Sequence, residues 1–374
     1  MAQLSDRMRA LVQPHLAQIE PYDPAFSQTR INLSANENTY PPPPAVRAAV
    51  DDALAATPLN RYPDPMSNRL RDLIAARGGH SRRQICVGNG GDELLFNFIM
   101  AFGGRGRTLL NCPPAFSEYE FFASVNQTQV KRVWRDPETF ELDMPRTLEA
   151  ASRSDMVILT SPNNPTGNLV GAHEVEQVCE ACPGMVMVDE AYIEFADPGS
   201  SVECLLPSHP NLVVLHTLSK AFGEAGVRCG YVVAAPDVID VFAAIRQIYS
   251  VNVLTQAAAE AALRMDVMFD PVVRQIRAER ERMVAALRTL LADVDAPSGD
   301  LAPAVWPSQG NFVLARVPDA ARVRERLRDE YSILVRDFSS APGLAGCLRI
   351  TVGTPEENDE VLRALSQLIK EDRS

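Results

Sequence analysis

One stretch limits the possible folds of this chain more than any other: an apolar run at Leu212–Leu215 that leads into hydroxyl side chains and a lysine. A run this short, rich in Val and Leu, is too brief for an isolated helix and predicts a buried β-strand. Thr217, Ser219 and Lys220 come just after it, and Arg228 follows the lysine. Open α/β sheets bind ligands beyond the carboxyl ends of their strands, so we expect these four side chains in a binding site.

This group of side chains suits two kinds of chemistry. Two cations and two hydroxyls can hold a phosphate, and a lysine amine is also a nucleophile once it is neutral. Nearby positive charge or an apolar setting lowers the pKa of a lysine toward that state. An ordinary surface lysine after a strand is the alternative that this stretch alone leaves open.

Strand-like and helix-like runs alternate over the first two thirds of the chain. The runs expected as strands cover residues 84–87, 108–111, 130–134, 156–160, 185–188, 212–215 and 231–234. Such alternation predicts an α/β fold with a mostly parallel seven-stranded sheet covered by helices. From about residue 253 a long charged helix and three strand-like runs predict a smaller α+β domain. We therefore expect an N-terminal arm (1–30) that begins with a helix over 4–19, a large domain (31–252) and a small C-terminal domain (253–374).

Composition narrows the class of protein. The chain has 374 residues, 46% of them hydrophobic and 22% charged, which is typical of a soluble globular protein. Its formal net charge of −12 argues against a nucleic-acid partner, so an anionic ligand needs a local basic pocket. No apolar run approaches the roughly 20 residues of a membrane span, and no signal-like core follows Met1, so we expect a cytoplasmic protein. The seven cysteines include one CxxC pair without a second pair, and we expect reduced thiols and no metal site.

Two further segments join the lysine stretch in a recognisable order. They are Ser161-Pro-Asn-Asn-Pro-Thr-Gly167 and Val188-Asp-Glu-Ala-Tyr192. The lysine stretch itself reads Ser219-Lys-Ala-Phe-Gly, four more residues, then Arg228-Cys-Gly-Tyr. Together they resemble the fold-type I pyridoxal-phosphate (PLP) enzymes. The resemblance implies that fold and pyridoxal 5'-phosphate as the cofactor.

The resemblance also implies roles for single residues. Lys220 would bind the cofactor covalently and carry a proton as general acid and base. Asp189 would stay ionised beside the protonated pyridine nitrogen. Tyr192 and Asn164 match residues that hydrogen-bond the phenolic oxygen of the cofactor. Phe116 matches the aromatic ring that stacks on it, although close relatives usually have Tyr there.

The phosphate of the cofactor needs its own group of donors. Glycines before a helix allow close backbone approach, and a helix N-terminus offers free N–H groups to an anion. The positions that match this phosphate site are Gly91, Asp92, Thr217, Ser219 and Arg228.

Within this superfamily the resemblance becomes narrower. The segments at 11–22, 35–38, 61–64 and 347–353 look like those of histidinol-phosphate aminotransferases, and the match runs nearly from end to end. It implies a homodimer in which Tyr62 reaches the cofactor phosphate of the neighbouring subunit. It also implies that Tyr22 closes over the substrate. The residues implied to bind the substrate also include Asn36, Arg336 and Arg349.

The implied reaction transfers the amino group of L-histidinol phosphate to 2-oxoglutarate, giving imidazole acetol phosphate and L-glutamate. Arg336 and Arg349 suit this exchange because guanidinium groups bind phosphate or carboxylate bidentately, although structural salt bridges are an alternative. Glu224, where relatives usually have small or apolar residues, leaves the exact substrate open. An aromatic amino-acid aminotransferase and a threonine-phosphate decarboxylase remain alternatives. A PLP-binding regulatory domain without turnover is a further one, disfavoured by the short segment before the main domain.

Overall fold

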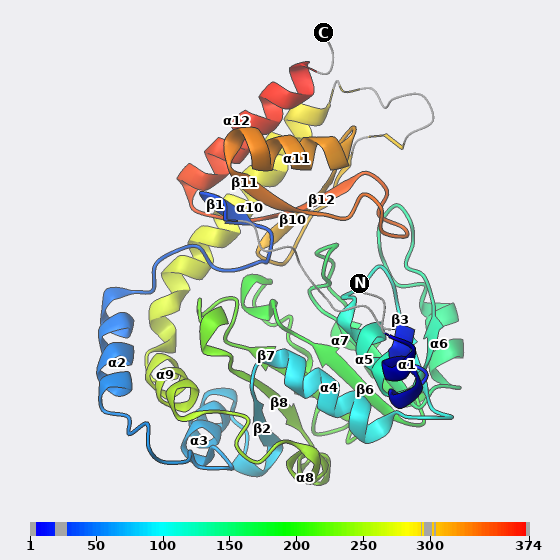
Figure 1. Ribbon diagram of the computed structural model, residues 1–374, viewed down its shortest axis with the longest axis vertical. Helices are drawn as coiled ribbons and strands as arrows, with labels where there is room; N and C mark the ends of the chain where they lie inside the picture. Colours follow the sequence, from blue (N-terminus) through cyan, green and yellow to red (C-terminus); the bar gives the residue numbers. More distant parts are fainter. Residues whose placement is uncertain (1–4, 19–27, 293, 295–300, 303, 372–374) are drawn as a thin grey trace.

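The computed structural model describes residues 5–18, 28–292, 294, 301–302 and 304–371. These residues form two lobes, each built on its own β-sheet (Figure 1). The lower lobe in that view holds a seven-stranded sheet, and the upper lobe holds a five-stranded one.

The larger sheet has the strand order β2-β8-β7-β6-β5-β3-β4. Its strands are β2 (Ile85–Gly88), β3 (Thr108–Asn111), β4 (Gln129–Arg132), β5 (Met156–Thr160), β6 (Met185–Asp189), β7 (Leu212–Thr217) and β8 (Gly230–Ala234). All pairings are parallel except those of β8, which is antiparallel to β2 and β7. The predicted α/β fold with a mostly parallel seven-stranded sheet is thereby confirmed.

Helices cover both faces of this sheet, which explains why its central strands are apolar along most of their length, up to the polar residues at their carboxyl ends. Val213 and Leu215 of β7 share one core cluster with Phe98 of α4 (Gly91–Phe102). Leu212 and Val214, on the opposite face, share a second cluster with residues of α7 (Ala172–Ala181). The remaining helices of this lobe are α2 (Pro44–Ala55), α3 (Asn68–Gly78), α5 (Glu118–Val125), α6 (Met144–Ala151), α8 (Pro236–Ile245) and α9 (Val253–Leu263).

The second sheet has the order β1-β11-β12-β10-β9. Its strands are β1 (Ile31–Leu33), β9 (Ala304–Val305), β10 (Phe312–Arg316), β11 (Ile333–Asp337) and β12 (Cys347–Thr351), and its helices are α10 (Asp270–Leu291), α11 (Ala320–Tyr331) and α12 (Pro355–Glu371). β1 pairs in parallel with β11, about three hundred residues further on, because both are short apolar strands that need a paired edge. The large domain expected over 31–252 thus begins with a strand of the second sheet, and the remaining domain division stays a prediction.

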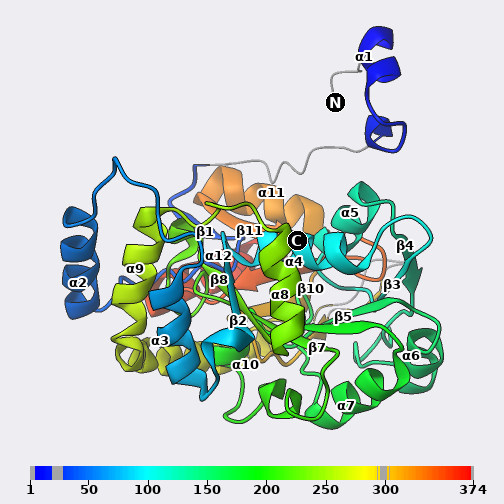
Figure 2. The same cartoon turned by 90° about the horizontal axis from the view of Figure 1, so that it is seen from below.

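The N-terminal segment is less helical than expected. α1 covers only Asp6–Leu11, and a single 3-10 turn follows at Leu16–Gln18. Pro14 lacks the N–H that a continuous helix needs, which explains why the helix expected over 4–19 is interrupted. α1 lies apart from the main body in Figure 2 and has no buried residue.

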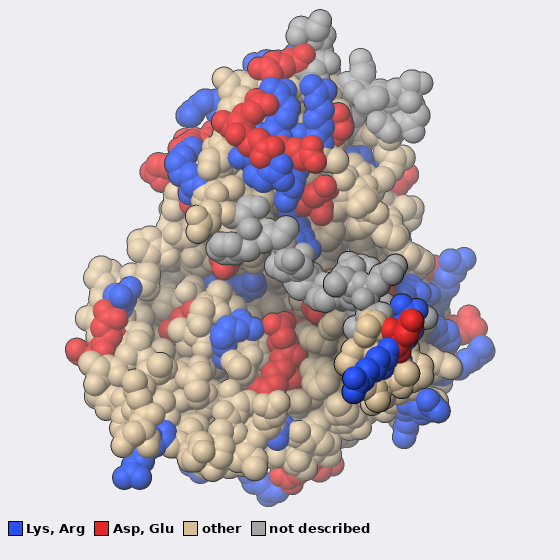
Figure 3. All heavy atoms as spheres, in the orientation of Figure 1, with Lys and Arg blue, Asp and Glu red and all other residues tan. Residues whose placement is uncertain are grey.

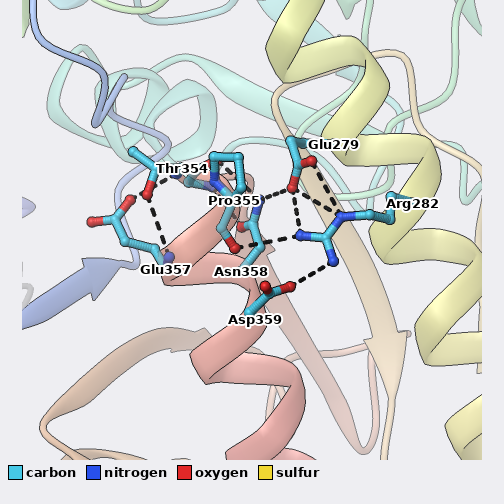
Figure 4. A network of polar contacts seen from close by, with 8 residues as sticks. Glu279, Arg282, Thr354, Pro355, Glu357, Asn358 and Asp359 are labelled. Carbon is cyan, nitrogen blue, oxygen red and sulfur yellow. Dashed lines mark hydrogen bonds and ion pairs between the residues drawn. The ribbon is translucent and has the colours of Figure 1, made fainter.

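A polar network fixes the turn between β12 and α12 (Figure 4). Thr354 and Glu357 form a capping box, in which each side chain accepts a hydrogen bond from the backbone N–H of the other. Asn358 donates to Glu279 of α10 at 2.8 Å, and Glu279 also pairs with Arg282. The network anchors the end of β12, a strand that lines the functional site, to the helix behind it.

Charged side chains of both signs lie side by side over the upper lobe (Figure 3). Arg326 of α11, for example, pairs with both Glu330 and Glu371. In the described part of the chain, none of the helices combines the length and apolar character that crossing a membrane requires.

Candidate active site

A cavity of about 770 Å³ lies where the two lobes meet. The carboxyl ends of β5, β6 and β7 and the start of α4 form one side, and β11 and β12 form the other. The predicted site residues that line it are Gly91, Asp92, Phe116, Asn164, Asp189, Tyr192, Thr217, Ser219, Lys220, Arg228, Arg336 and Arg349. Residues far apart in sequence therefore surround one space, as expected for the carboxyl edge of a parallel sheet.

Asp189 is the last residue of β6 and only 5% exposed. Its Oδ2 accepts a hydrogen bond from the Tyr119 hydroxyl at 2.7 Å, and its Oδ1 accepts one from the backbone N–H of Ala191. Burial raises the pKa of Asp189, and these two donors offset part of that rise. Among the described residues no Lys, Arg or His forms an ion pair with Asp189, so a buried cationic ligand would stabilise its ionised form.

Tyr119 and Thr160 were not identified from the sequence. The Tyr119 hydroxyl also lies 2.7 Å from Thr160 Oγ1, which places both next to Asp189. Tyr119 is three residues after Phe116, and the two rings meet edge-on with centroids 5.6 Å apart. A spacing of three places residues on one side of a helical turn, and this spacing was the available signal.

Lys220 follows β7 and reaches the cavity from the side opposite the second sheet. Its Nζ donates to the backbone carbonyl of Ala35 at 2.8 Å and lies 5.9 Å from the ring centre of Tyr192. Burial and the guanidinium of Arg349 lower the pKa of Lys220 to about 8. The lysine therefore has the neutral fraction near neutral pH that a nucleophile requires.

Asn36 supports the site from outside the cavity. It is fully buried, has a left-handed backbone with φ 54°, and donates from Nδ2 to the Tyr192 hydroxyl at 3.0 Å. Thr351 of β12 donates to its Oδ1. The structure thus shows Asn36 positioning Tyr192, while its expected contact with substrate stays a prediction.

The start of α4 forms an anion cradle. Gly90 precedes the helix with φ 83°, and no side chain caps the first backbone N–H groups. Such a terminus favours a bound anion. Arg228 lies over it, because a Cβ at Gly90 would be only 2.6 Å from its Nη2, and it pairs with Asp92 at 3.0 Å. The hydroxyls of Thr217 and Ser219 lie beside each other at 3.0 Å on the same side of the cavity.

Two arginines enter from the second sheet. Arg336 and Arg349 are directly opposite each other in the antiparallel pair β11–β12. Arg349 is only 6% exposed, and its guanidinium donates to Asn164 Oδ1 at 2.5 Å and to the carbonyl of Ser34 at 2.6 Å. Both of these acceptors are neutral oxygens, and the Arg349 side chain lines the cavity.

Three other expected features lie elsewhere. Tyr62 is 79% exposed and stacks on Tyr249 with ring centres 4.4 Å apart, and it does not line the cavity. Tyr22 lies outside the described residues. Glu224 is buried away from the cavity wall, where burial raises its pKa to about 8.

None of the cysteines lines this cavity. Cys179 and Cys182 of the CxxC pair are free and buried. Among the described residues, no group of three or more His, Cys, Asp or Glu is placed to hold a metal ion.

A half-buried lysine, a buried aspartate and an anion cradle lie together at the carboxyl edge of this sheet. The family model for class I and II aminotransferases matches residues 28–365, and the chain belongs to that family.

Several relatives within this family share one named activity. The chain is 39% identical to the histidinol-phosphate aminotransferase of Corynebacterium glutamicum over 91% of both chains. It is 37% identical to histidinol-phosphate aminotransferase 1 of Carboxydothermus hydrogenoformans, over 94% of this chain and 97% of that one. The crystal structure of the Sinorhizobium meliloti histidinol-phosphate aminotransferase with pyridoxal-5'-phosphate matches with a TM-score of 0.84 and 26% identity, covering 96% and 98% of the two chains.

Proposed function

We propose that this chain is a pyridoxal-phosphate-dependent transaminase of histidine biosynthesis. It transfers the amino group of L-histidinol phosphate to 2-oxoglutarate and forms imidazole acetol phosphate and L-glutamate. The observation that carries the proposal is the buried Asp189 without a cationic partner, placed in one cavity with Lys220 and the anion cradle of α4. The identity of 35–39% to histidinol-phosphate aminotransferases over nearly the full chain supports the substrate.

The residues present fit pyridoxal phosphate. Asp189 is a carboxylate whose buried charge calls for a cation, and a protonated pyridine nitrogen is one. The cradle at Gly91, with Arg228 above it, suits a phosphate. When bound, the cofactor supplies an electron sink for the carbanion formed as a proton leaves the substrate Cα.

The chain's own side chains divide the remaining work. Lys220 would hold the cofactor and then, as a neutral amine, take the proton from the substrate and return it. Tyr192, oriented by Asn36, and Asn164, held by Arg349, would hydrogen-bond the cofactor. Phe116 would stack on its ring.

The substrate's anionic end would bind the second sheet. Arg336 and Arg349 approach the cavity from adjacent strands. A guanidinium can form two parallel hydrogen bonds with a phosphate or with a carboxylate. One pair can therefore serve both substrates in turn. Tyr22 would close over them.

We also propose that the enzyme is a cytoplasmic homodimer with shared active sites. Tyr62 is exposed beside other exposed apolar side chains, including Leu59, Ile248 and Tyr249, and a patch of this kind favours a protein interface. All seven cysteines are free, which suits a reducing compartment.

The shared-site proposal is tested with a hybrid dimer of a Lys220→Ala subunit and a Tyr62→Ala subunit. If Tyr62 serves the neighbouring subunit, the hybrid contains one intact site and regains activity that neither parent homodimer has. A hybrid no more active than the Tyr62→Ala parent contradicts the proposal.

The reaction is tested by a single-turnover measurement on the holoenzyme. The absorbance spectrum of the bound cofactor is followed after mixing with histidinol phosphate, phenylalanine or threonine phosphate in separate experiments. Rapid change with histidinol phosphate, reversed by 2-oxoglutarate, is the expected result. Faster change with phenylalanine, or carbon dioxide release from threonine phosphate, would refute the proposed substrate.

A further inference from the structure

The hydroxyl of Tyr192 is held by a residue that the second sheet fixes in place. Tyr192 follows β6 in the lower lobe, and its hydroxyl accepts a hydrogen bond from Asn36 Nδ2 at 3.0 Å. Thr351, at the end of β12, accepts from the backbone N–H of Asn36 at 3.0 Å. Asn311, just before β10, donates to the backbone carbonyl of Asn36 at 3.0 Å. Side chains of the second sheet therefore satisfy both backbone polar groups of Asn36, and both are fully buried.

The amide of Asn36 has two orientations to choose from. The Thr351 hydroxyl, which accepts from the Asn36 N–H, donates its own hydrogen to Asn36 Oδ1 at 3.1 Å. This contact leaves Nδ2, which can only donate, facing the Tyr192 hydroxyl. With the amide turned over, Oδ1 would face Tyr192 and the buried Thr351 hydrogen would lose its acceptor, which costs free energy. Thr351 therefore favours the orientation in which Asn36 donates to Tyr192.

This orientation decides what the Tyr192 hydroxyl can do. A phenolic hydroxyl has one hydrogen, and Tyr192 does not spend it on Asn36 because it accepts there. Tyr192 lines the cavity, and its hydroxyl forms no other hydrogen bond with any described residue. Burial raises the pKa of Tyr192 above its ordinary value of 10, so the hydroxyl keeps its hydrogen at neutral pH. The hydrogen is therefore available to a ligand in the cavity.

We propose that Thr351 is a positioning residue that orients Asn36 so that Tyr192 donates its hydrogen to the phenolic oxygen of the cofactor. The inference rests on the proposed function for the contact between Tyr192 and the cofactor, and it places control of that contact in the second sheet. With the amide turned over, Tyr192 would donate to Asn36 instead, and the phenolic oxygen would lose a donor.

The test is a pH titration of the absorbance of the bound cofactor in the holoenzyme. The phenolic oxygen accepts from the nitrogen that joins the cofactor to Lys220 while that nitrogen is protonated. A second donor to the same oxygen weakens this contact, so it lowers the pKa of the nitrogen and with it the midpoint of the titration. Loss of the Tyr192 donor should therefore raise the midpoint.

Four variants separate the role of Thr351 from a loss of stability. Thr351→Val removes the hydroxyl and keeps the branched shape, Thr351→Ser keeps the hydroxyl, and Tyr192→Phe removes the proposed donor itself. Thr128→Val is the matched control. Thr128 is also buried and also accepts from a backbone N–H, that of Gly104, but it does not line the cavity.

Tyr192→Phe is expected to raise the midpoint by about 1–2 pH units, the effect of one hydrogen bond to a charged group. Thr351→Val should raise it by at least about 0.5 units, whereas Thr351→Ser and Thr128→Val should stay within about 0.2 units of the wild type. Thr351→Val added to Tyr192→Phe should cause no further rise, because Thr351 acts only through the Tyr192 hydroxyl. An unmoved midpoint in Thr351→Val, or a further rise in the double variant, would overturn the inference.

Asn36→Asp provides the same information if Thr351→Val does not fold. Aspartate has the shape of asparagine, but its carboxylate only accepts, so Tyr192 would donate to it and not to the cofactor. The midpoint should rise more when Asn36→Asp is made in the wild type than when it is made in Tyr192→Phe, where only the added charge acts. Equal rises in the two backgrounds would contradict the proposal.

The inference and the proposed function fail separately. If Thr351→Val shifts the midpoint as expected but the wild type does not use histidinol phosphate, the proposed substrate is wrong and the role of Thr351 stands. If the wild type uses histidinol phosphate and only Tyr192→Phe shifts the midpoint, the function stands and the role of Thr351 is wrong. An unmoved midpoint in Tyr192→Phe refutes the cofactor contact and the inference together.

Discussion

Glu203→Gln removes the carboxylate at the centre of a charge cluster behind the active site. Glu203 Oε1 lies 2.7 Å from Nε2 of His216, and its Oε2 lies 2.8 Å from Nε2 of His80. Glu190 Oε2 is 3.7 Å from the same His216 nitrogen. His216 directly precedes Thr217, and Glu190 directly follows Asp189. The cluster therefore supports the two strand ends that carry these site residues.

The magnitude follows from the pKa of Glu203. Burial alone would raise this pKa, but the contacts with His216 and His80 outweigh burial and lower it from 4.5 to about 2. At about 1.4 kcal/mol for each pH unit, the difference corresponds to about 3 kcal/mol of folding stability. A chain of this length has an unfolding entropy of roughly 0.8 kcal/mol per degree, so the Tm should fall by about 4 °C.

The pH dependence has a defined sign. A carboxyl with a lowered pKa stabilises the fold above its ordinary value of 4.5, and this contribution is lost as the pH falls from 4.5 toward 2. Burial lowers the pKa of His216, but the ion pair with Glu203 outweighs burial and raises it above 6.5 overall. The contribution of charged His216 is complete below pH 6.5 and is lost as the pH rises through the raised pKa.

The Tm difference between wild type and Glu203→Gln should therefore be largest between about pH 4.5 and 6.5 and smaller on either side. Thermal unfolding of the holoenzyme, followed by circular dichroism at several pH values, measures it. Asp329→Asn, in an exposed pair with Arg328, is the control and should shift the Tm by less than about 1 °C. A Glu203→Gln shift no larger than this control, or one independent of pH, would refute the reasoning.

Further outcomes are expected at the active site. Tyr119→Phe removes a donor to Asp189, so the pKa of Asp189 should rise and the acidic limb of the pH–rate profile should move to higher pH; an unmoved limb contradicts this. Binding of added cofactor to apoenzyme should quicken as the pH rises through about 8, because the neutral amine of Lys220 is the nucleophile. The Lys220→Ala variant should lose this pH-dependent step, and its turnover should fall at least about 100-fold. Gly230→Ala places a Cβ 2.7 Å from the backbone of Gly90, so it should weaken cofactor binding and lower the Tm by a few degrees, measured by cofactor titration and thermal melts.

Much of the fold could be predicted because its signal is local. The apolar run at Leu212–Leu215 became the core of β7, and the strand at Met156–Thr160 has the predicted bounds. Continuous burial on both faces selects Val, Leu, Ile and Met at successive positions, which makes a central parallel strand visible in the sequence. The helix expected over 4–19 was wrong in length because its pattern ignored Pro14.

The site was predicted in part for a related reason. Thr217, Ser219 and Lys220 follow a strand directly, so their place at the carboxyl edge needs only the strand and the chain direction. Tyr119 was not identified because its importance lies in its hydrogen bond to Asp189, 70 residues further on. That contact depends on how α5 packs against the sheet, and its spacing from Phe116 alone does not show it.

The sequence by itself determined the strands, the order of the motifs and the residues that can perform the chemistry, because these depend on local pattern and side-chain type. Only the tertiary structure decided that β1 pairs with β11, that Asn36 holds Tyr192 and that an arginine of α11 faces the cavity with Lys220. Contacts between residues so far apart depend on how two lobes pack, and packing is a collective property of many side chains rather than of any segment.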